Sequence, residues 1–296
     1  MLPETWTILK LLKWTGTYFK SHQIEQPRAA AEILLAHTLG VGRVDLYIQY
    51  DRQLEPEELE LFKRFIQKRI QREPVAYIVG KKEFWSMDLK VTPDVLIPRP
   101  ETETLVEAAL TIVPPEPTSV PFNVLDLGTG SGAIVLAIAS ERIGHSFYAV
   151  DRSEKALAVA QDNARTYELN KTITFLQGNW LDPVRDRGHY FDVIVSNPPY
   201  IPSDEFEMLA PEVVQHEPRG ALEGGADGLE AIRLIIKKAA NCLVPGGWLL
   251  FEIGHDQWAR VKKLIAESGA YSDWSVIKDY SGYDRVVRAK ARDNKR

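Results

Sequence analysis

The sequence predicts an α/β protein whose main domain has a doubly wound, mostly parallel β-sheet. From about residue 123 onward, short apolar runs typical of buried strands alternate with helical patterns, which favours a parallel sheet with helices on both faces. Before about residue 73, apolar residues recur at steps of three and four, which indicates amphipathic helices. We therefore expect a small N-terminal helical bundle followed by a Rossmann-like domain.

The first expected domain is helical and covers residues 1–74. Helical periodicity occurs in "WTILKLLKWTGTYF", "PRAAAEILLAHTLG" and "PEELELFKRFIQKRI". Pro27 and Pro56 stand where helices begin, and Gly40 stands just past a helix end. Residues 75–96 are expected to form a β-hairpin linker, because "VAYIVGKKEFWSMDLKV" alternates and contains a Gly-Lys-Lys turn signal.

The second expected domain covers residues 97–296 and holds the sheet. Its predicted parallel strands are "NVLDLG", "FYAVD", "ITFLQGN", "DVIVSN" and "GWLLFEIG". Its predicted helices are "AIVLAIASER", "SEKALAVAQDNARTY", "LEAIRLIIKKAANCL" and "QWARVKKLIAES". The segment "WSVIKDYSGYDRVVRAK" predicts two further strands around a Ser-Gly turn, so the C-terminal edge of the sheet should be antiparallel.

Composition narrows the class of protein. The 296 residues are 45% hydrophobic and 26% charged, as in a soluble globular chain, and no apolar stretch approaches the roughly 18 residues of a membrane span. The single cysteine, Cys242, excludes an intramolecular disulfide, and a cytoplasmic location is expected. The histidines lack ligand-like spacing, so no metal is expected. The net charge of -5 argues against direct binding of nucleic acid, and we expect a monomer that binds no membrane.

A glycine-rich turn follows the first predicted strand of the second domain, in "VLDLGTGSGAI". Its spacing is G-x-G-x-G, unlike the G-x-G-x-x-G of dinucleotide sites, and a carboxylate precedes it. A carboxylate there suits a cationic ligand, so S-adenosylmethionine, with its ammonium and sulfonium groups, fits better than NAD. The alternative is a tight turn that binds no ligand. The candidate cofactor-binding residues of this turn are Asp126, Gly128, Thr129, Gly130, Ser131 and Gly132.

The next two strand ends add candidate cofactor contacts. Asp151 lies about twenty residues beyond the glycines, where a carboxylate can accept both ribose hydroxyls, although it could instead cap the following helix. Asn179 and Trp180 reach the same edge of the sheet, suited to hydrogen bonding and stacking an adenine. The alternative for Trp180 is a place in the core.

The fourth predicted strand ends in Asn-Pro-Pro-Tyr, residues 197–200. The prolines remove backbone donors and fix φ, so this rigid turn presents acceptors. The Asn197 side-chain oxygen and the Pro198 carbonyl could hold both hydrogens of a planar NH2 group, with Tyr200 packing on its conjugated face. Asn197, Pro198 and Tyr200 are the candidate catalytic residues, and Pro199 joins them in the candidate substrate site. The alternative is a proline turn that only ends a strand.

These acceptors match the chemistry of methyl transfer to a conjugated nitrogen. Such an NH2 is a poor nucleophile, because full loss of amide conjugation costs about 18–20 kcal/mol. Methyl transfer moves positive charge onto the nitrogen, and fixed acceptors stabilise that charge as it develops. No general base is needed before attack, in agreement with a motif that contains neither histidine nor cysteine.

At this point the sequence resembles the bacterial release-factor glutamine N5-methyltransferases, the HemK/PrmC family. The resemblance runs from about Gln26 to Val287 and rests on "IPRPETE", "DLGTGSGAI", "VSNPPYI", "HEPRGALEGGADGLEAIR", "FEIGHDQ" and "DYSGYDRVV". It implies a class I S-adenosylmethionine-dependent methyltransferase that modifies the glutamine of the Gly-Gly-Gln loop in class I peptide chain release factors. It also implies that the helical domain helps to bind the release factor.

The resemblance also implies residue roles. Residues 128–132, Asp151, Trp180 and Asn197 would contact S-adenosylmethionine, and residues 197–200 would hold the glutamine. Asn179 departs from the family, since many relatives have Asp there, but an amide can still accept a hydrogen bond from adenine N6.

Three more segments are left with alternatives. "IPRPETE" is either a proline linker or places Arg99 and Glu101 beside the cofactor. Residues 203–228 form either a surface loop or a lid over the glutamine. Glu252 ends the fifth strand and receives no role.

Two other functions remain open. A nucleic-acid methyltransferase acting on adenine N6 or guanine N2 would meet the same kind of NH2 but would need a basic channel. A binding protein that keeps the fold without catalysis is the other, and the presence of Asp126, Asp151 and Asn197 in one chain argues against it.

Overall fold

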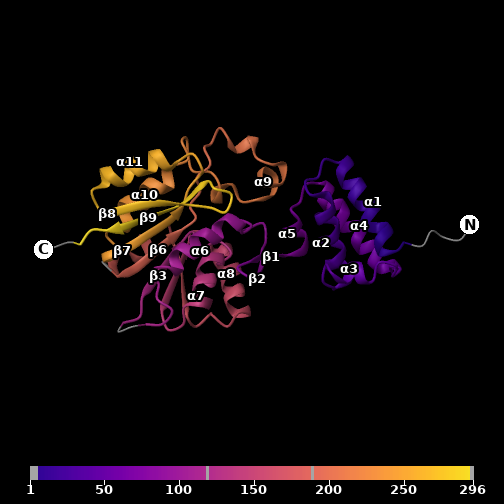
Figure 1. Ribbon diagram of the computed structural model, residues 1–296, viewed down its shortest axis with the longest axis horizontal. Helices are drawn as coiled ribbons and strands as arrows, with labels where there is room; N and C mark the ends of the chain where they lie inside the picture. Colours follow the sequence, from indigo (N-terminus) through magenta and orange to yellow (C-terminus); the bar gives the residue numbers. More distant parts are fainter. Residues whose placement is uncertain (1–5, 118–119, 188–189, 294–296) are drawn as a thin grey trace, which may run out of the picture. The chain divides into compact units, whose positions relative to one another are not determined.

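The computed structural model describes residues 6–117, 120–187 and 190–293, and Figure 1 follows them by colour along the chain. It contains two compact units. The helical unit comprises Met1–Gly80 and Ala210–His216, and the sheet unit comprises Lys81–Leu209 and Glu217–Arg296. The first break therefore lies after Gly80, not at residue 74, and a short segment from late in the sequence belongs with the N-terminal helices.

The helical unit is built around one apolar core. The side chains of Phe19, Leu34, Leu35 and Phe62 are almost completely buried in it. The three long helices agree with the predicted segments, and α9 comes from the later part of the chain. The helices are α1 (Ile8–Ser21), α2 (Pro27–Leu39), α3 (Asp45–Ile48), α4 (Pro56–Ile70), α5 (Val75–Val79) and α9 (Pro211–His216).

The hairpin is shorter than the sequence predicted. Val75–Val79 forms helix α5, because Pro74 caps its start and Gly80 ends it with a φ of 75°. The two strands are β1 (Lys81–Phe84) and β2 (Met87–Lys90), and they pair antiparallel. The turn lies at Trp85 and Ser86, with φ of 52° and 58°, so the prediction of a Gly-Lys-Lys turn was wrong.

The sheet unit contains a seven-stranded sheet. The strand order is β5-β4-β3-β6-β7-β9-β8. The first five strands in this order run parallel, and β9 and β8 form an antiparallel edge. The strands are β3 (Asn123–Leu127), β4 (Ser146–Asp151), β5 (Ile173–Gln177), β6 (Phe191–Ser196), β7 (Leu243–Glu252), β8 (Tyr271–Lys278) and β9 (Asp284–Ala291). The predicted doubly wound sheet with an antiparallel C-terminal edge is confirmed.

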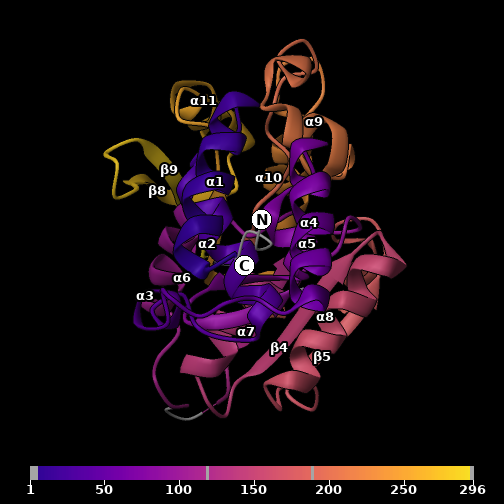
Figure 2. The same ribbon diagram turned by 90° about the vertical axis from the view of Figure 1, so that its right-hand side faces the viewer.

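Both faces of this sheet are covered by helices. Along β6, Val193 and Val195 join the core cluster that contains α6 and α7, whereas Ile194 joins the cluster that contains α10 and α11. Figure 2 shows α8 alongside β4 and β5. The α-helices of this unit are α6 (Glu103–Leu110), α7 (Ala133–Glu141), α8 (Glu154–Thr166), α10 (Glu230–Ala239) and α11 (Trp258–Ser268). The short 3-10 turns are η1 (Pro100–Thr102), η2 (Asp182–Arg187), η3 (Phe206–Met208) and η4 (Arg219–Ala221).

The strand order places a ligand crevice. The chain moves outward from β3 through β4 to β5 and then returns to β6 on the other side of β3. Crevices in such sheets open beyond the carboxyl ends of the strands at this reversal. Asp126, Asp151 and Asn197 stand at or near those ends. Within the described part of the chain, no helix is long and apolar enough to span a membrane.

Candidate active site

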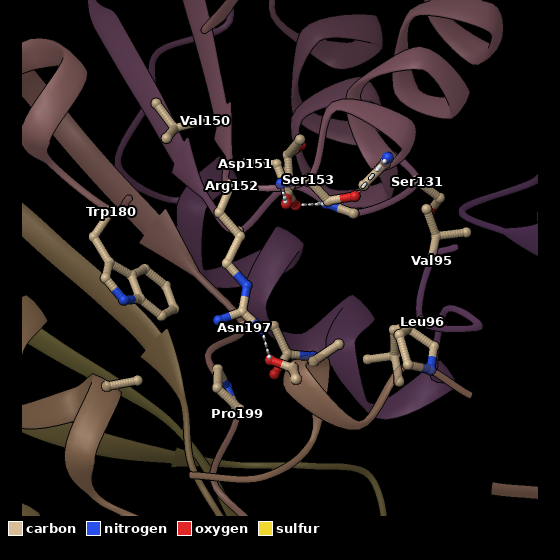
Figure 3. A pocket seen from close by; sticks show the side chains of 18 of the residues that line it. Val95, Leu96, Ser131, Val150, Asp151, Arg152, Ser153, Trp180, Asn197 and Pro199 are labelled. Atoms are coloured by element: carbon tan, nitrogen blue, oxygen red, sulfur yellow. Dashed lines mark hydrogen bonds between the residues drawn. The ribbon is translucent and has the colours of Figure 1, made fainter. Parts of the chain in front are cut away.

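A cavity of about 990 Å³ opens at this point of the sheet. Its volume falls near the upper end of the roughly 300–1,000 Å³ typical of small-molecule sites. All of its lining residues belong to the sheet unit. The lining includes most of the residues predicted from the sequence, namely Gly128, Thr129, Gly130, Ser131, Asp151, Asn179, Trp180, Asn197 and Pro199. Figure 3 shows Asn197 and Pro199 across the cavity from Asp151, with Trp180 to one side.

The glycine turn is held by backbone contacts with β4. The amides of Gly128 and Thr129 donate to the Val150 carbonyl at 2.8 and 3.0 Å. Gly128 and Gly130 line the cavity with φ of 71° and 56°, values that favour glycine. The turn therefore exposes backbone to whatever occupies the cavity.

Gly132 has a different role in the same turn. It does not line the cavity but precedes α7 with a φ of 85°. A Cβ at Gly132 would lie 3.1 Å from the Leu136 side chain and 3.2 Å from Ala160 Cβ. Gly132 is thus required for the close packing of α7 on α8, and unlike Gly128 and Gly130 it lies outside the cavity lining.

The structure also corrects the expectation for Asp126. Its side chain is completely buried and does not line the cavity. The Thr129 hydroxyl donates to Asp126 Oδ2 at 2.6 Å. Burial raises the pKa of this carboxyl to about 7, although the Thr129 hydroxyl and the Val135 amide at the start of α7 favour its charged form. Asp126 therefore stabilises the glycine turn from the protein interior, through its hydrogen bond with Thr129.

Asp151 lies in the cavity lining and joins two elements. Its Oδ2 accepts from the Gly130 amide and its Oδ1 from the Ser153 amide, both at 2.9 Å. Ser153 in turn caps α8. Each carboxyl oxygen has a further lone pair, so these contacts leave acceptor capacity toward the cavity.

Trp180 lies on one wall of the cavity, and Val95 and Leu96 lie on the opposite wall, as Figure 3 shows. The Trp180 ring lies 3.5 Å from the position that a Cβ of Gly128 would occupy. Trp180 also packs against the core cluster of α10 and α11, so it serves both the cavity and the core. Asn179 is exposed at the cavity edge. The sequence reasoning did not single out Val95 or Leu96, since apolar residues in a loop carry no signal of their own.

The Asn-Pro-Pro-Tyr turn divides between the cavity and its support. Asn197 and Pro199 line the cavity, whereas Pro198 is buried and neither Pro198 nor Tyr200 lines it. The Tyr200 hydroxyl donates to Glu252 Oε1 at 3.0 Å, and burial raises its pKa. The expected packing of Tyr200 on a substrate amide is therefore not seen in the cavity lining.

The glycine-rich segment "LEGGADGL" packs directly on this turn. A Cβ at Gly224 would lie 2.7 Å from the Pro199 carbonyl oxygen, and one at Gly228 would lie 2.3 Å from that of Tyr200. The Gln257 amide also donates to the Tyr200 carbonyl at 2.8 Å. Glycines are needed here because two backbones pass in contact.

The segment Ser203–Gly228 belongs to both units. Seven of its residues line the cavity: Ser203, Pro218, Gly220, Ala221, Glu223, Gly224 and Gly225. Its middle, Ala210–His216, belongs to the helical unit, where Glu212 pairs with Arg69 at 2.8 Å. Arg152, which the sequence reasoning missed, donates to the Gly220 carbonyl at 3.2 Å.

The "IPRPETE" motif joins the same wall. Arg99 lines the cavity and pairs with the buried carboxyl of Glu217 at 2.5 Å, and the Ile97 amide donates to Glu217 Oε2. Thr102 also lines the cavity, whereas Glu101 does not. The motif is therefore part of the site and more than a linker.

Comparison with known proteins assigns both parts of the chain. Residues 10–80 match the family model described as the PrmC N-terminal domain, and residues 112–226 match the methyltransferase small domain. The release factor glutamine methyltransferase of Geobacter sulfurreducens is 43% identical over 285 residues, which cover 96% of this chain and 97% of that protein. The chain belongs to the release factor glutamine methyltransferase family. The resemblance seen in the sequence is thus confirmed.

Further relatives agree with this assignment. The release factor glutamine methyltransferase of Coxiella burnetii is 43% identical over 89% of this chain and 92% of that protein. Among solved structures, the 16S rRNA N2 G1207 methyltransferase of T. thermophilus, in complex with AdoMet and guanosine, superposes with a TM-score of 0.53 at 22% identity. That superposition covers 72% of this chain and 50% of the other. At this identity it shows a shared fold for the two proteins.

Proposed function

We propose that this enzyme transfers a methyl group from S-adenosyl-L-methionine to the side-chain amide N5 of the glutamine in the Gly-Gly-Gln motif of class I peptide chain release factors. The modification would tune translation termination in the cytoplasm. The observation that carries the proposal is the placement of Asn197, which lines the same cavity as the glycine turn and Asp151. Family membership supplies the substrate class.

The residues of the cavity fit the cofactor. Gly128 and Gly130 let a ligand approach the backbone, Asp151 offers acceptors for ribose hydroxyls, and Trp180 offers an aromatic surface for adenine. When bound, S-adenosylmethionine supplies an activated methyl group on its sulfonium. The exposed Asn179 lies at the edge of this region and could accept from adenine N6.

The Asn-Pro-Pro-Tyr turn would hold the substrate amide. Asn197 Oδ1 and the Pro198 carbonyl would accept its two hydrogens, so that the nitrogen is oriented and its developing positive charge is stabilised. The cofactor would supply the methyl group to the oriented nitrogen, which would then lose one proton to solvent. Tyr200 would contribute by fixing the turn from its buried side.

We further propose roles for the rest of the chain. The helical unit would help to bind the release factor, and exposed side chains such as Trp14 and Tyr47 offer it contact surface. Residues 203–228 would act as a lid over the glutamine. The enzyme would act as a monomer.

The experiment that tests the function is mass spectrometry of a class I release factor after incubation with enzyme and cofactor. We expect one added methyl group on the glutamine of the Gly-Gly-Gln motif, and none on a release factor in which that glutamine is replaced. Asn197→Ala should lower kcat by about 100-fold or more with little change in cofactor affinity. Parallel reactions with DNA and rRNA test the alternative of a nucleic-acid methyltransferase. Methylation of nucleic acid alone would overturn the proposal.

A further inference from the structure

A buried chain of hydrogen bonds stands behind Asn197. Asn197 Nδ2 donates to Thr102 Oγ1 at 3.2 Å, and the Thr102 hydroxyl donates to Glu252 Oε2 at 2.7 Å. Thr102 is 4% exposed and Glu252 only 1%. Figure 3 draws the hydrogen bond that leaves Asn197 on the side away from Asp151. Three motifs that are distant in sequence therefore meet in one chain of contacts.

These hydrogen bonds can be donated in one direction only, from Asn197 to Thr102 and from Thr102 to Glu252. A carboxylate can only accept, and both oxygens of Glu252 are used in this way, one by Thr102 and the other by the Tyr200 hydroxyl. Thr102 has a single hydroxyl proton, which it donates to Glu252. The Thr102 oxygen must therefore accept from Asn197, which only the NH2 half of that amide can satisfy.

This direction matters because an asparagine amide is nearly symmetric in shape. A half-turn about its last side-chain bond exchanges oxygen and nitrogen at almost no steric cost. With Nδ2 held by Thr102, Oδ1 is left at the opposite edge of the amide, free to serve the cavity that Asn197 lines. The turned amide would present a donor to the NH2 of the substrate, and two donors repel.

We propose that Thr102 and Glu252 are positioning residues that fix the Asn197 amide so that Oδ1 faces the substrate NH2. This inference rests on the proposed function and deepens it, since it assigns a task to two residues that do not react. It also explains why an acidic side chain is buried at the end of β7.

Burial is the largest influence on Glu252 and raises its pKa above the usual range, and Glu101 adds to this effect. The hydroxyls of Thr102 and Tyr200 act against it, as does Arg285, which pairs with Asp279 at 3.0 Å; these three neighbours favour the carboxylate form that the hydrogen-bond direction requires.

The test compares substitutions that keep shape but change hydrogen bonding. Thr102→Val removes the hydroxyl, and we expect kcat for the release factor to fall roughly 10-fold to 100-fold with little change in cofactor affinity. Thr102→Ser restores the hydroxyl and should return kcat to within about threefold of wild type. Glu252→Gln can donate as well as accept, so it should lower kcat by a smaller factor, about 10-fold.

Thr104→Val is the matched control. Thr104 is equally buried, at 4% exposure, and within the described part of the chain its hydroxyl has no hydrogen-bond partner. Its replacement should leave kcat unchanged. Wild-type kcat in Thr102→Val, or an equal loss in Thr102→Ser and Thr102→Val, would overturn the inference.

A measurement on the wild type covers the case in which both Thr102→Val and Glu252→Gln fail to fold. The side-chain NH2 of Asn197 should exchange with solvent more slowly than that of the exposed Asn179, as followed by NMR. Equal exchange would overturn the inference. The two proposals fail in different ways: a wild-type enzyme that does not methylate the release factor defeats the proposed function, whereas an active wild type matched by Thr102→Val defeats only the positioning role.

Discussion

Two aspartates at the ends of neighbouring strands differ in role because their surroundings differ. Asp126 is completely buried under the glycine turn, and burial raises its pKa to about 7. Asp151 lines the cavity and accepts from the Gly130 and Ser153 amides. Residue type alone suggested a ligand contact for both. The depth of each side chain could not be read from the sequence, since both aspartates stand at the carboxyl end of a similar apolar strand.

The raised pKa of Asp126 predicts a pH-dependent stability. Its pKa rises from 3.8 to about 7 on folding, so the folded state disfavours the charged form. This cost is absent below pH 3.8 and grows as pH rises to about 7, where three pKa units correspond to about 4 kcal/mol. Asp126→Asn cannot ionise and should escape this loss.

Denaturant unfolding of wild type and Asp126→Asn between pH 4 and 8, without cofactor, measures the effect. The free energy of unfolding of the variant relative to wild type should increase with pH up to about 7 and then level off. A constant difference at all pH values would contradict the assignment of a buried, destabilised carboxylate.

At the scale of elements, sequence periodicity was sufficient for the long helices and the parallel strands. Strands such as β6 carry continuous apolar runs, because both faces of the sheet are covered. Helix α5 was missed because "VAYIV" is β-branched and aromatic, yet Ile78 is buried against the other helices. Tertiary packing overrode local preference.

The hairpin turn was missed for a related reason. Trp85 and Ser86 adopt positive φ, a conformation that the sequence pattern assigns to glycine or asparagine. Carboxylates hold them in place, since the Trp85 amide donates to Glu103 and the Ser86 amide donates to Glu83. The contact with Glu103 joins residues 18 positions apart, so it leaves no local signal.

The glycine turn before α7 allows a matched test of two glycines. Gly132→Ala introduces strain at positive φ and crowds Leu136 and Ala160, so we expect a loss of stability of about 2–4 kcal/mol. Gly130→Ala meets no atom within 4 Å and should cost only about 1–2 kcal/mol.

Cofactor binding should separate the same two variants. Gly130 lines the cavity, so Gly130→Ala should weaken cofactor affinity in calorimetry, whereas folded Gly132→Ala should bind close to normally. The opposite order, with Gly132→Ala the weaker binder, would show that Gly132 contacts the cofactor after all.

At the scale of the whole molecule, motifs that are far apart in sequence meet at the Asn-Pro-Pro-Tyr turn. Thr102 contacts Asn197, Gly224 and Gly228 pack on the backbone of the turn, and Glu252 binds the Tyr200 hydroxyl. Sequence reasoning identified many of the polar and glycine residues that line the cavity, because their chemistry is directed at a ligand, but it missed Val95, Leu96 and Arg152. It assigned no role to Glu252, whose role depends on partners 52 and 150 positions away.

The middle of the segment 203–228 is held within the helical unit by ion pairs of Glu212. Glu212 pairs with Arg69 at 2.8 Å and with Arg72 at 3.4 Å, and the Arg69 and Glu212 side chains are only 6% and 14% exposed. Burial raises the pKa of Glu212. Hydrogen bonds from its own backbone amide, Arg69 and Arg72 have the larger opposite effect, so the pKa lies below its usual value of 4.5.

Glu212→Gln should therefore destabilise the protein by about 1–3 kcal/mol at pH 7. Because the folded pKa of Glu212 is lowered, its contribution is complete above pH 4.5 and is lost as pH falls through the folded value. The difference between wild type and Glu212→Gln should accordingly shrink in acid. Glu267→Gln is the control, since its pair with Lys263 is exposed and should contribute almost nothing.

The same variant separates anchoring of this segment from cofactor binding. No residue of Ala210–His216 lines the cavity, so Glu212→Gln should bind the cofactor as wild type does. If the anchored segment helps to receive the release factor, KM for that substrate should rise several-fold while kcat changes little. A variant with normal KM and normal stability would show that the ion pair between Arg69 and Glu212 neither holds the segment nor serves the substrate.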